Sequence, residues 1–211
     1  MRFAEGDQGV RSDFASALWA LSDSRGDRPV LARAPFAILT RMLLIVDAQV
    51  NQFEPPMAVH DGPQILERLK SLIKRAREAH VPVAFIQNDG GEIDPDFPGA
   101  PGWALHPELI PVGSEKVYRK TTTDSFHETG LLEDLRAAGV TDLVIAGMQS
   151  NYCINATTRR AVQEGFNVML VSDAHSTFSF TDEPASAIIE AQNAALGKLV
   201  PLAKAAEISF R

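Results

Sequence analysis

The chain has 211 residues, of which 45% are hydrophobic and 22% are charged, a composition typical of a soluble globular protein with one folded domain. Its formal net charge of -7 argues against nucleic acid or a membrane surface as the main partner, because either needs a concentrated basic face. No apolar stretch approaches the roughly 20 residues that cross a bilayer, so a small molecule or another protein is the expected partner.

Residues 1–41 differ from the rest of the chain because they mix both charge signs with Gly and Pro and show no sustained periodicity. We interpret them as an N-terminal extension and residues 42–211 as the folded domain. Met42 directly precedes the first strong strand pattern, so a start codon assigned too early is one explanation. The alternative is a short amphipathic helix that docks on the domain or on a second subunit. The apolar piece "FASALWAL" is too short and too acidically flanked to predict a signal peptide.

From Met42 onward, short apolar runs typical of buried strands alternate with amphipathic segments typical of helices. In chain order, we expect a strand at 42–49, a helix at 62–80, strands at 81–89 and 116–120, a helix at 128–139, a strand at 142–148, a helix at 151–165, a strand at 167–174, a helix from about 182 to 196, and a short sixth strand at 206–210. This alternation predicts an α/β fold of three layers, α/β/α, around a mostly parallel six-stranded sheet.

Polar residues follow the ends of several predicted strands. In open sheets of this class the functional crevice lies outside the carboxyl ends of the strands. The residues that the pattern places near this rim are Asp47, Asn88, Asp89, Lys120, the loop after Gly147, Asp173 and His175.

Cys153, the only cysteine of the sequence, lies where the loop after strand 142–148 enters a helix. Backbone N–H groups and the helix dipole stabilise a thiolate at such a position, which favours a nucleophile. The alternative is a buried small hydrophobic residue. A lone cysteine can form neither an internal disulfide nor a thiolate zinc site, so we expect a reducing, cytoplasmic location.

Asp47 and Lys120 are weaker candidates when each is taken alone. Asp47 ends the first strand, where an ionised carboxylate is costly unless it is paired, binds a metal or acts as a base, although such residues also cap turns. Lys120 ends strand 116–120, and most lysines are simply solvated. What links both residues to Cys153 is that all three lie at carboxyl ends of strands in one predicted sheet.

Several ordered motifs resemble those of a known family. They are "LLIVDAQ", "GWALHPEL", "KTTTDSFHETGLLEDLRAAGVTDLVIAGMQSNYCINATTRRAVQEGFNVMLVSDAHSTF" and "AEISF". From Met42 to its C-terminus, the chain resembles the isochorismatase-like cysteine hydrolases. The segments "GMQSNYC" and "SDAHSTF" are most similar to the corresponding segments of a subgroup that includes streptothricin hydrolase-like enzymes.

The resemblance implies a catalytic triad in which Cys153 is the nucleophile, Asp47 accepts its proton, and Lys120 fixes charge and orientation. It also implies a cis peptide bond between Met148 and Gln149, and an oxyanion hole formed by the backbone N–H groups of Gln149 and Cys153. The implied reaction is the cleavage of an amide or cyclic amide. Cys153 attacks the carbonyl carbon, the amine leaves, and water opens the thioester.

Some members of this family, the nicotinamidases, bind a metal through an Asp-x-His pair and further histidines after the second strand. Here that region reads "NDGGEIDPDFPG", without a histidine before His106. We therefore expect no metal and no cofactor, while leaving open whether the Asp89 region binds one. His106 and His175 lie in the matched motifs and are at best supporting residues; the other histidines are expected to cap turns or face solvent.

Four further residues are candidates for substrate binding. Phe53, Trp103 and Tyr152 could stack on a flat substrate at the rim, and Gln49 could bond either the substrate or a supporting group. Each of the aromatic residues could equally be plain packing. Family members generally associate, so we expect a homodimer or a larger homo-oligomer.

Two other functions compete with the hydrolase. One is a non-catalytic relative that binds a metabolite or a protein partner in the same pocket. The other is a thiol redox protein, which the absence of a resolving cysteine in the chain disfavours.

Overall fold

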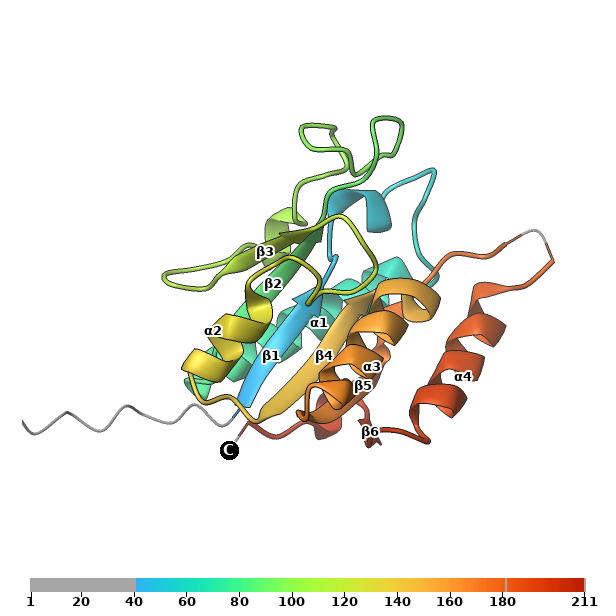
Figure 1. Ribbon diagram of the computed structural model, residues 1–211. Coiled ribbons are helices and arrows are strands. Elements are labelled where there is room, and N and C mark those ends of the chain that lie inside the picture. Colours follow the sequence, from blue (N-terminus) through green and yellow to red (C-terminus); the bar gives the residue numbers. More distant parts are fainter. Residues whose placement is uncertain (1–40, 181, 211) are drawn as a thin grey trace, which may run out of the picture. The chain divides into compact units, whose positions relative to one another are not determined.

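The computed structural model describes residues 41–180 and 182–210. The predicted N-terminal extension lies outside the described residues, apart from Arg41, which begins the first strand. The described chain forms a six-stranded sheet in the order β3-β2-β1-β4-β5-β6, in which every pairing is parallel. The predicted α/β fold is therefore confirmed, and the sheet is parallel throughout (Figure 1).

Strands and helices alternate along the chain as expected. Their bounds are β1 Arg41–Val46, α1 Gly62–Glu78, β2 Val83–Asn88, β3 Val117–Lys120, α2 Leu131–Ala137, β4 Asp142–Met148, α3 Asn155–Gln163, β5 Asn167–Ser176, α4 Ala185–Leu196 and β6 Leu202–Ala203. A π-helical segment, Ser150–Ile154, connects β4 to α3.

The sheet is apolar on both faces because helices cover both. Side chains alternate along a strand, so Leu43 and Ile45 of β1 pack in the cluster that contains α1. Leu44 and Val46 pack in the opposite cluster, to which α2, α3 and α4 contribute. Figure 1 shows α1 behind the sheet and α2 and α3 in front of it. This double cover explains why the central strands read as continuous apolar runs.

The expected sixth strand at 206–210 is wrong. The sixth strand is β6, which pairs with β5 through Leu170 and Leu202 and through Val171 and Ala203. After β6, the Glu207 carboxylate accepts a hydrogen bond from the Lys204 backbone N–H at 2.8 Å, which starts a single 3-10 turn. The apolar residues that resembled a strand, Ile208 and Phe210, are buried in the α1 cluster instead.

Gly147 allows β1 and β4 to approach closely just before the functional rim. It pairs with Val46 and has a positive φ of 126°. A Cβ added at this glycine would lie 2.0 Å from the Val46 carbonyl oxygen, so a side chain cannot fit without moving the backbone. The glycine thus fixes the spacing of the two strand ends that precede Asp47 and Gln149.

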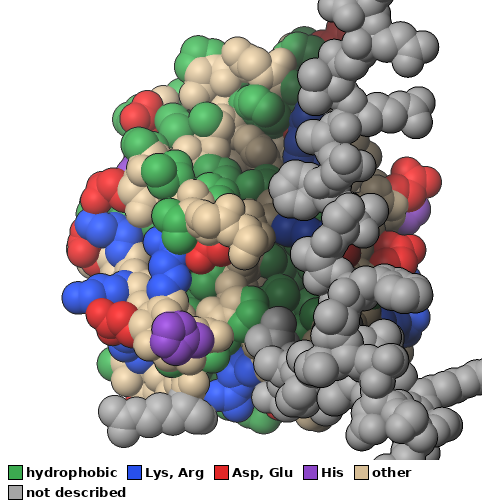
Figure 2. All heavy atoms as spheres, turned by 90° about the vertical axis from the view of Figure 1, so that its left-hand side faces the viewer, with side chains coloured by type: hydrophobic (Ala, Val, Ile, Leu, Met, Phe, Trp, Pro, Cys, Tyr) green, Lys and Arg blue, Asp and Glu red, His purple; other side chains and the backbone are tan. Residues whose placement is uncertain are grey.

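Charged residues on the described surface are mixed in sign. Figure 2 looks at the left-hand side of Figure 1 and shows Lys and Arg side chains next to Asp and Glu side chains. Two of the ion pairs in this part of the fold are Lys116 with Asp134 at 2.7 Å and Arg119 with Asp89 at 2.6 Å. Among the described residues, no helix combines the length and hydropathy that a bilayer crossing requires.

Candidate active site

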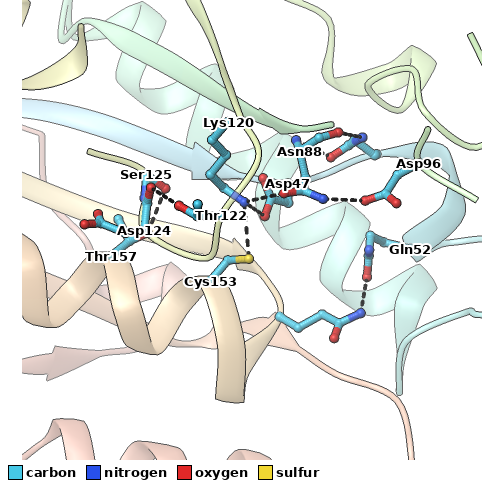
Figure 3. A network of polar contacts seen from close by, with 12 residues as sticks. Asp47, Gln52, Asn88, Asp96, Lys120, Thr122, Asp124, Ser125, Cys153 and Thr157 are labelled. Carbon is cyan, nitrogen blue, oxygen red and sulfur yellow. Dashed lines mark hydrogen bonds and ion pairs between the residues drawn. The ribbon is translucent and has the colours of Figure 1, made fainter. Parts of the chain in front are cut away.

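Three sequence-predicted residues meet at the carboxyl ends of the strands. Lys120 Nζ lies 2.7 Å from Asp47 Oδ2 and 3.3 Å from Cys153 Sγ (Figure 3). It also donates to Asn88 Oδ1 at 3.0 Å. The ammonium group therefore directs its three N–H donors to three different side chains, which fixes its position.

The strand order explains why these residues meet. The order reverses between β1 and β4, which is where open parallel sheets form their functional crevice. Asp47 directly follows β1, and Cys153 lies just beyond β4. Lys120 ends β3 opposite Asn88 of β2 and reaches back toward β1 across that strand.

Burial sets the protonation of the three groups. Burial raises the pKa of the Asp47 carboxyl, although Lys120 opposes the rise. Burial lowers the pKa of Lys120, but its interactions with Asp47 and Cys153 outweigh this effect, so the pKa is raised. Burial, then the Asp47 carboxylate, raises the pKa of the Cys153 thiol to about 12. The contact of 2.7 Å with the Lys120 ammonium supports the ionised form of Asp47, so we assign a carboxylate, an ammonium and a thiol to the resting site, with no net charge.

The position of Cys153 before a helix favours a thiolate, whereas desolvation and the adjacent carboxylate raise the pKa of the thiol. Asp47 Oδ1 is buried and has no hydrogen-bond partner among the described residues. It is therefore a free acceptor, and transfer of the thiol proton to Asp47 would leave the net charge of the site unchanged.

The segment that carries Cys153 is irregular. The peptide bond between Met148 and Gln149 is cis, at the position where the resemblance places it. The Gln149 carbonyl accepts hydrogen bonds from the N–H groups of Tyr152 and Ile154, each at 3.1 Å. The Gln149 side chain donates to Gln52 Oε1 at 3.0 Å, so the segment is anchored at its first turn (Figure 3). The oxyanion hole at Gln149 and Cys153 stays a prediction.

A cavity of about 290 Å³ opens beside Asp47 and Cys153. Most of its lining residues have polar side chains; they are Asp47, Gln52, Asn88, Asp96, Thr121, Thr122, Thr123, Gln149, Tyr152 and Cys153. Sequence reasoning missed Gln52, Asp96 and the threonines as site residues. The run "TTTD" directly after Lys120 was the signal that could have indicated the threonines.

The segment 121–125 after β3, called the threonine loop below, contacts α3. The hydroxyls of Ser125 and Thr157 lie 2.7 Å apart (Figure 3), and Arg160 Nη1 of α3 lies 3.3 Å from Asp124 Oδ2. Because α3 directly follows the segment that contains Cys153, these contacts connect the threonine loop to the helix next to the nucleophile.

Of the four predicted substrate contacts, Tyr152 lines the cavity. Gln49 is instead fully buried, and its amide bonds the Asn88 backbone and the Trp103 carbonyl. Phe53 packs against His106 with ring centroids 4.9 Å apart. The Trp103 ring lies under Arg119, and its Nε1 donates to Asp89 at 2.9 Å. None of these three residues is among those that line the cavity, and their contact with a substrate stays a prediction.

The Asp89 region does not fit a metal. Its carboxylate oxygens accept hydrogen bonds from Trp103 and from the Arg119 guanidinium, so both are occupied. Within the part of the chain that the structure describes, no group of three or more His, Cys, Asp or Glu side chains could hold a metal ion. Catalysis without metal remains a prediction, and we derive no metal-dependent step.

Comparisons with known proteins identify a family and several relatives of this chain. Residues 41–203 match the model of the isochorismatase domain family. The chain is 42% identical over 142 residues to the streptothricin hydrolase of Streptomyces noursei, an alignment that covers 67% of this chain and 51% of that protein. It is 32% identical over 176 residues to the uncharacterized isochorismatase family protein YddQ of Bacillus subtilis strain 168, covering 80% of this chain and 98% of that protein.

A solved isochorismatase from Pseudomonas putida KT2440 superposes with a TM-score of 0.76 at 26% sequence identity, covering 82% of this chain and 91% of that chain. The chain spans about half the length of the streptothricin hydrolases it matches.

Proposed function

Because the chain belongs to the isochorismatase family, we propose that it is a cysteine hydrolase that cleaves a carbon–nitrogen bond of a small amide through a thioester on Cys153. The observation that carries the proposal is the position of Lys120 Nζ, 2.7 Å from the Asp47 carboxylate and 3.3 Å from the Cys153 sulfur. A buried cation there holds a base and a nucleophile in one place.

The reaction follows from the resting protonation. As Cys153 Sγ attacks the carbonyl carbon of the amide, its proton passes to Asp47, and negative charge develops on the carbonyl oxygen. Backbone N–H groups of Gln149 and Cys153 would stabilise that oxygen. Asp47 then gives the proton to the departing nitrogen, the C–N bond breaks, and an acyl thioester remains. Asp47 takes a proton from water as the hydroxide opens the thioester, and that proton returns to the sulfur.

Lys120 has an electrostatic role in this scheme. The site carries one anionic charge that alternates between carboxylate, sulfur and carbonyl oxygen, while the ammonium charge stays in place. Its raised pKa keeps Lys120 protonated throughout, so it acts as a fixed counter-ion rather than as an acid.

The lining of the cavity favours a polar substrate without anionic groups. The charges of Asp47 and Lys120 compensate each other, whereas the Asp96 carboxylate is held by the Asn88 amide at 2.8 Å and by no cation among the described residues. A small or cyclic amide with hydroxyl, amine or ammonium groups would match Asp96 and the threonines. The similarity to a streptothricin hydrolase supports an amide of this kind.

We also propose a cytoplasmic homodimer or larger homo-oligomer. The single cysteine suits a reducing compartment. At the β6 edge of the sheet, Leu199 and Leu202 are exposed, and such apolar groups favour a subunit contact. Light scattering on a size-exclusion column measures the assembly directly.

The experiment that tests the function measures ammonia release from a panel of primary amides, and the appearance of a free amine from a panel of cyclic amides, with the wild-type chain and with Cys153→Ala. The proposal expects turnover of at least one polar amide by the wild type and a loss of more than about 1000-fold in Cys153→Ala. Full activity in Cys153→Ala would refute the mechanism. Tight binding of an amide without any turnover would identify a non-catalytic binding protein.

A further inference from the structure

A chain of hydrogen bonds links the Cys153 segment to α4 through side chains that the proposed reaction does not use. Ser150 Oγ lies 2.8 Å from His175 Nδ1, and His175 Nε2 lies 3.0 Å from Asn193 Oδ1. The Asn193 amide donates in turn to the Ser172 carbonyl at 3.0 Å. Ser150 and His175 are 0% and 1% exposed, so water does not compete for these bonds.

The direction of each bond follows from Asn193. Its Nδ2 donates to a carbonyl, so the atom that faces His175 is the acceptor Oδ1. Nε2 of His175 therefore carries the imidazole proton, and Nδ1 offers a lone pair to the Ser150 hydroxyl. Protonation of the ring would place N–H groups at both nitrogens, so Nδ1–H would donate to Ser150 Oγ, the direction of that bond would reverse, and the Ser150 hydroxyl proton would need another acceptor.

The surroundings keep the ring neutral. Burial lowers the pKa of His175, against the smaller opposite effects of Asn193 and the Asp173 carboxylate. On the side away from Cys153, the ring borders a cavity of about 340 Å³ whose other charged or titratable groups are His60 and Asp61 before α1, Arg68 of α1, Asp173 of β5 and Glu190 of α4. Arg68 pairs with Asp173 at 3.6 Å, which reduces the field of that carboxylate at the ring.

The backbone brings these hydrogen-bonded side chains close to the segment that carries the nucleophile. β5 pairs with β4 through a register shift after Ile145, so that His175 lies opposite Gly147. Ser150 opens the π-helical segment and Cys153 is its fourth residue, with Gln149 immediately before it. A change in the Ser150 contact therefore acts on the residues that would hold the oxyanion and supply the sulfur.

We infer that Ser150, His175 and Asn193 are positioning residues that hold the Gln149–Cys153 turn in its reactive shape while His175 is neutral and alter that shape when protonation of His175 reverses the Ser150 bond. The inference rests on the proposed function for its effect on catalysis. Activity should fall on the acid side with the protonation of His175, and the fall should appear in kcat rather than in KM.

The first test needs no substrate. Proton–nitrogen NMR spectra of the full chain, recorded from about pH 8 to about pH 4.5, follow the His175 ring together with the backbone amides of Gln149 and Cys153. The inference expects both amides to shift with the same midpoint as the ring. In Ser150→Ala the ring should still titrate, and the Cys153 amide should no longer follow it.

Asn193→Asp supplies a signature that a purely structural role would not give. A carboxylate facing Nε2–H stabilises the imidazolium, so the midpoint and the acid limb of kcat should both move up by about one pH unit. The matched control is Gln192→Glu, which adds the same charge one residue earlier, where the side chain accepts from Asn155 instead of facing His175. The control should leave both midpoints in place.

Two outcomes would overturn the inference. One is a Cys153 amide that ignores the His175 titration in the wild type. The other is an Asn193→Asp acid limb that stays where it was while the ring midpoint moves. If no amide is turned over at all, the proposed function fails, and the NMR titration still decides whether the nucleophile turn is coupled to His175.

Discussion

Lys120 Nζ and Asp47 Oδ2 lie 2.7 Å apart, and their side chains are 0% and 4% exposed. A buried ion pair of this kind contributes little to stability on balance, because the desolvation of both charges offsets their attraction. Its value here is chemical. The pair holds a carboxylate next to a thiol that would otherwise have no base, and it keeps the site neutral before and after proton transfer.

Replacing Asp47 by Asn should separate the reactivity of the thiol from catalysis. The Asp47 charge contributes to the raised pKa of Cys153, so its removal lowers that pKa and increases the thiolate fraction at neutral pH. Alkylation of Cys153 by iodoacetamide should therefore become faster, while amide hydrolysis falls by more than about 100-fold because the proton acceptor is gone. Intact mass after timed alkylation measures the first effect, since the chain has one cysteine. A slower alkylation in Asp47→Asn would contradict the assigned protonation.

Replacing Lys120 by Met should cost stability and activity together. The change leaves the Asp47 carboxylate buried without its partner, which we expect to lower the free energy of unfolding by about 3–5 kcal/mol. The double variant Asp47→Asn, Lys120→Met removes that unpaired charge and should regain part of the stability but none of the activity. Lys116→Met is the control, because Lys116 forms an exposed pair with Asp134 worth about 1 kcal/mol or less. Urea unfolding of the four proteins checks this; equal losses for Lys120→Met and Lys116→Met would argue against a buried pair.

Gly147→Ala should damage the fold at the rim of the site. The new Cβ would meet the Val46 backbone at 2.0 Å, and the residue would keep a positive φ. Overpacking and backbone strain together predict a loss of about 3 kcal/mol or more. At Gly165, φ is also positive, but a Cβ meets nothing within 4 Å. Gly165→Ala should therefore cost only about 1 kcal/mol. Similar thermal unfolding of the two variants would show that the close approach of β1 and β4 does not matter.

Asp96 should determine the charge preference of the cavity. Two methanethiosulfonate reagents that differ in a trimethylammonium or a sulfonate group modify Cys153 at rates whose ratio reports the local potential. We expect the cation to be favoured in the wild type and the ratio to fall by about threefold to tenfold in Asp96→Asn. Glu92→Gln removes the same charge from an exposed position of the same loop that does not line the cavity, and should leave the ratio unchanged. An equal change in both variants would assign the effect to net charge alone.

The sequence alone predicted the fold because its strands carry a strong signal. The bounds of the predicted strand at 142–148 coincide with those of β4. A parallel strand that is covered on both faces is apolar along its whole length, so its ends are easy to recognise in the sequence. The segment at 206–210 has a similar local pattern, but its apolar residues face the core from a 3-10 turn and an extended tail. Local pattern cannot distinguish these two ways of burying Ile208 and Phe210.

The triad could be predicted, whereas most of the pocket could not. Asp47, Lys120 and Cys153 follow strand ends, so topology alone brings them together. The cavity wall depends on how the 88–106 loop folds back, and that is set by pairings distant in sequence, such as Gln49 with Asn88 and Trp103. The same pairings occupy the Gln49 amide with the loop itself, a contact that the sequence pattern did not indicate.

The thioester on Cys153 is the central claim, and the most direct measurement is the intact mass of the protein quenched in acid during turnover of an amide that releases ammonia. The account predicts an added mass equal to the acyl part of that amide, located on the peptide that contains Cys153, removed by hydroxylamine and absent from Cys153→Ala. Steady ammonia release without any adduct, under conditions in which opening of the thioester is rate-limiting, would contradict it.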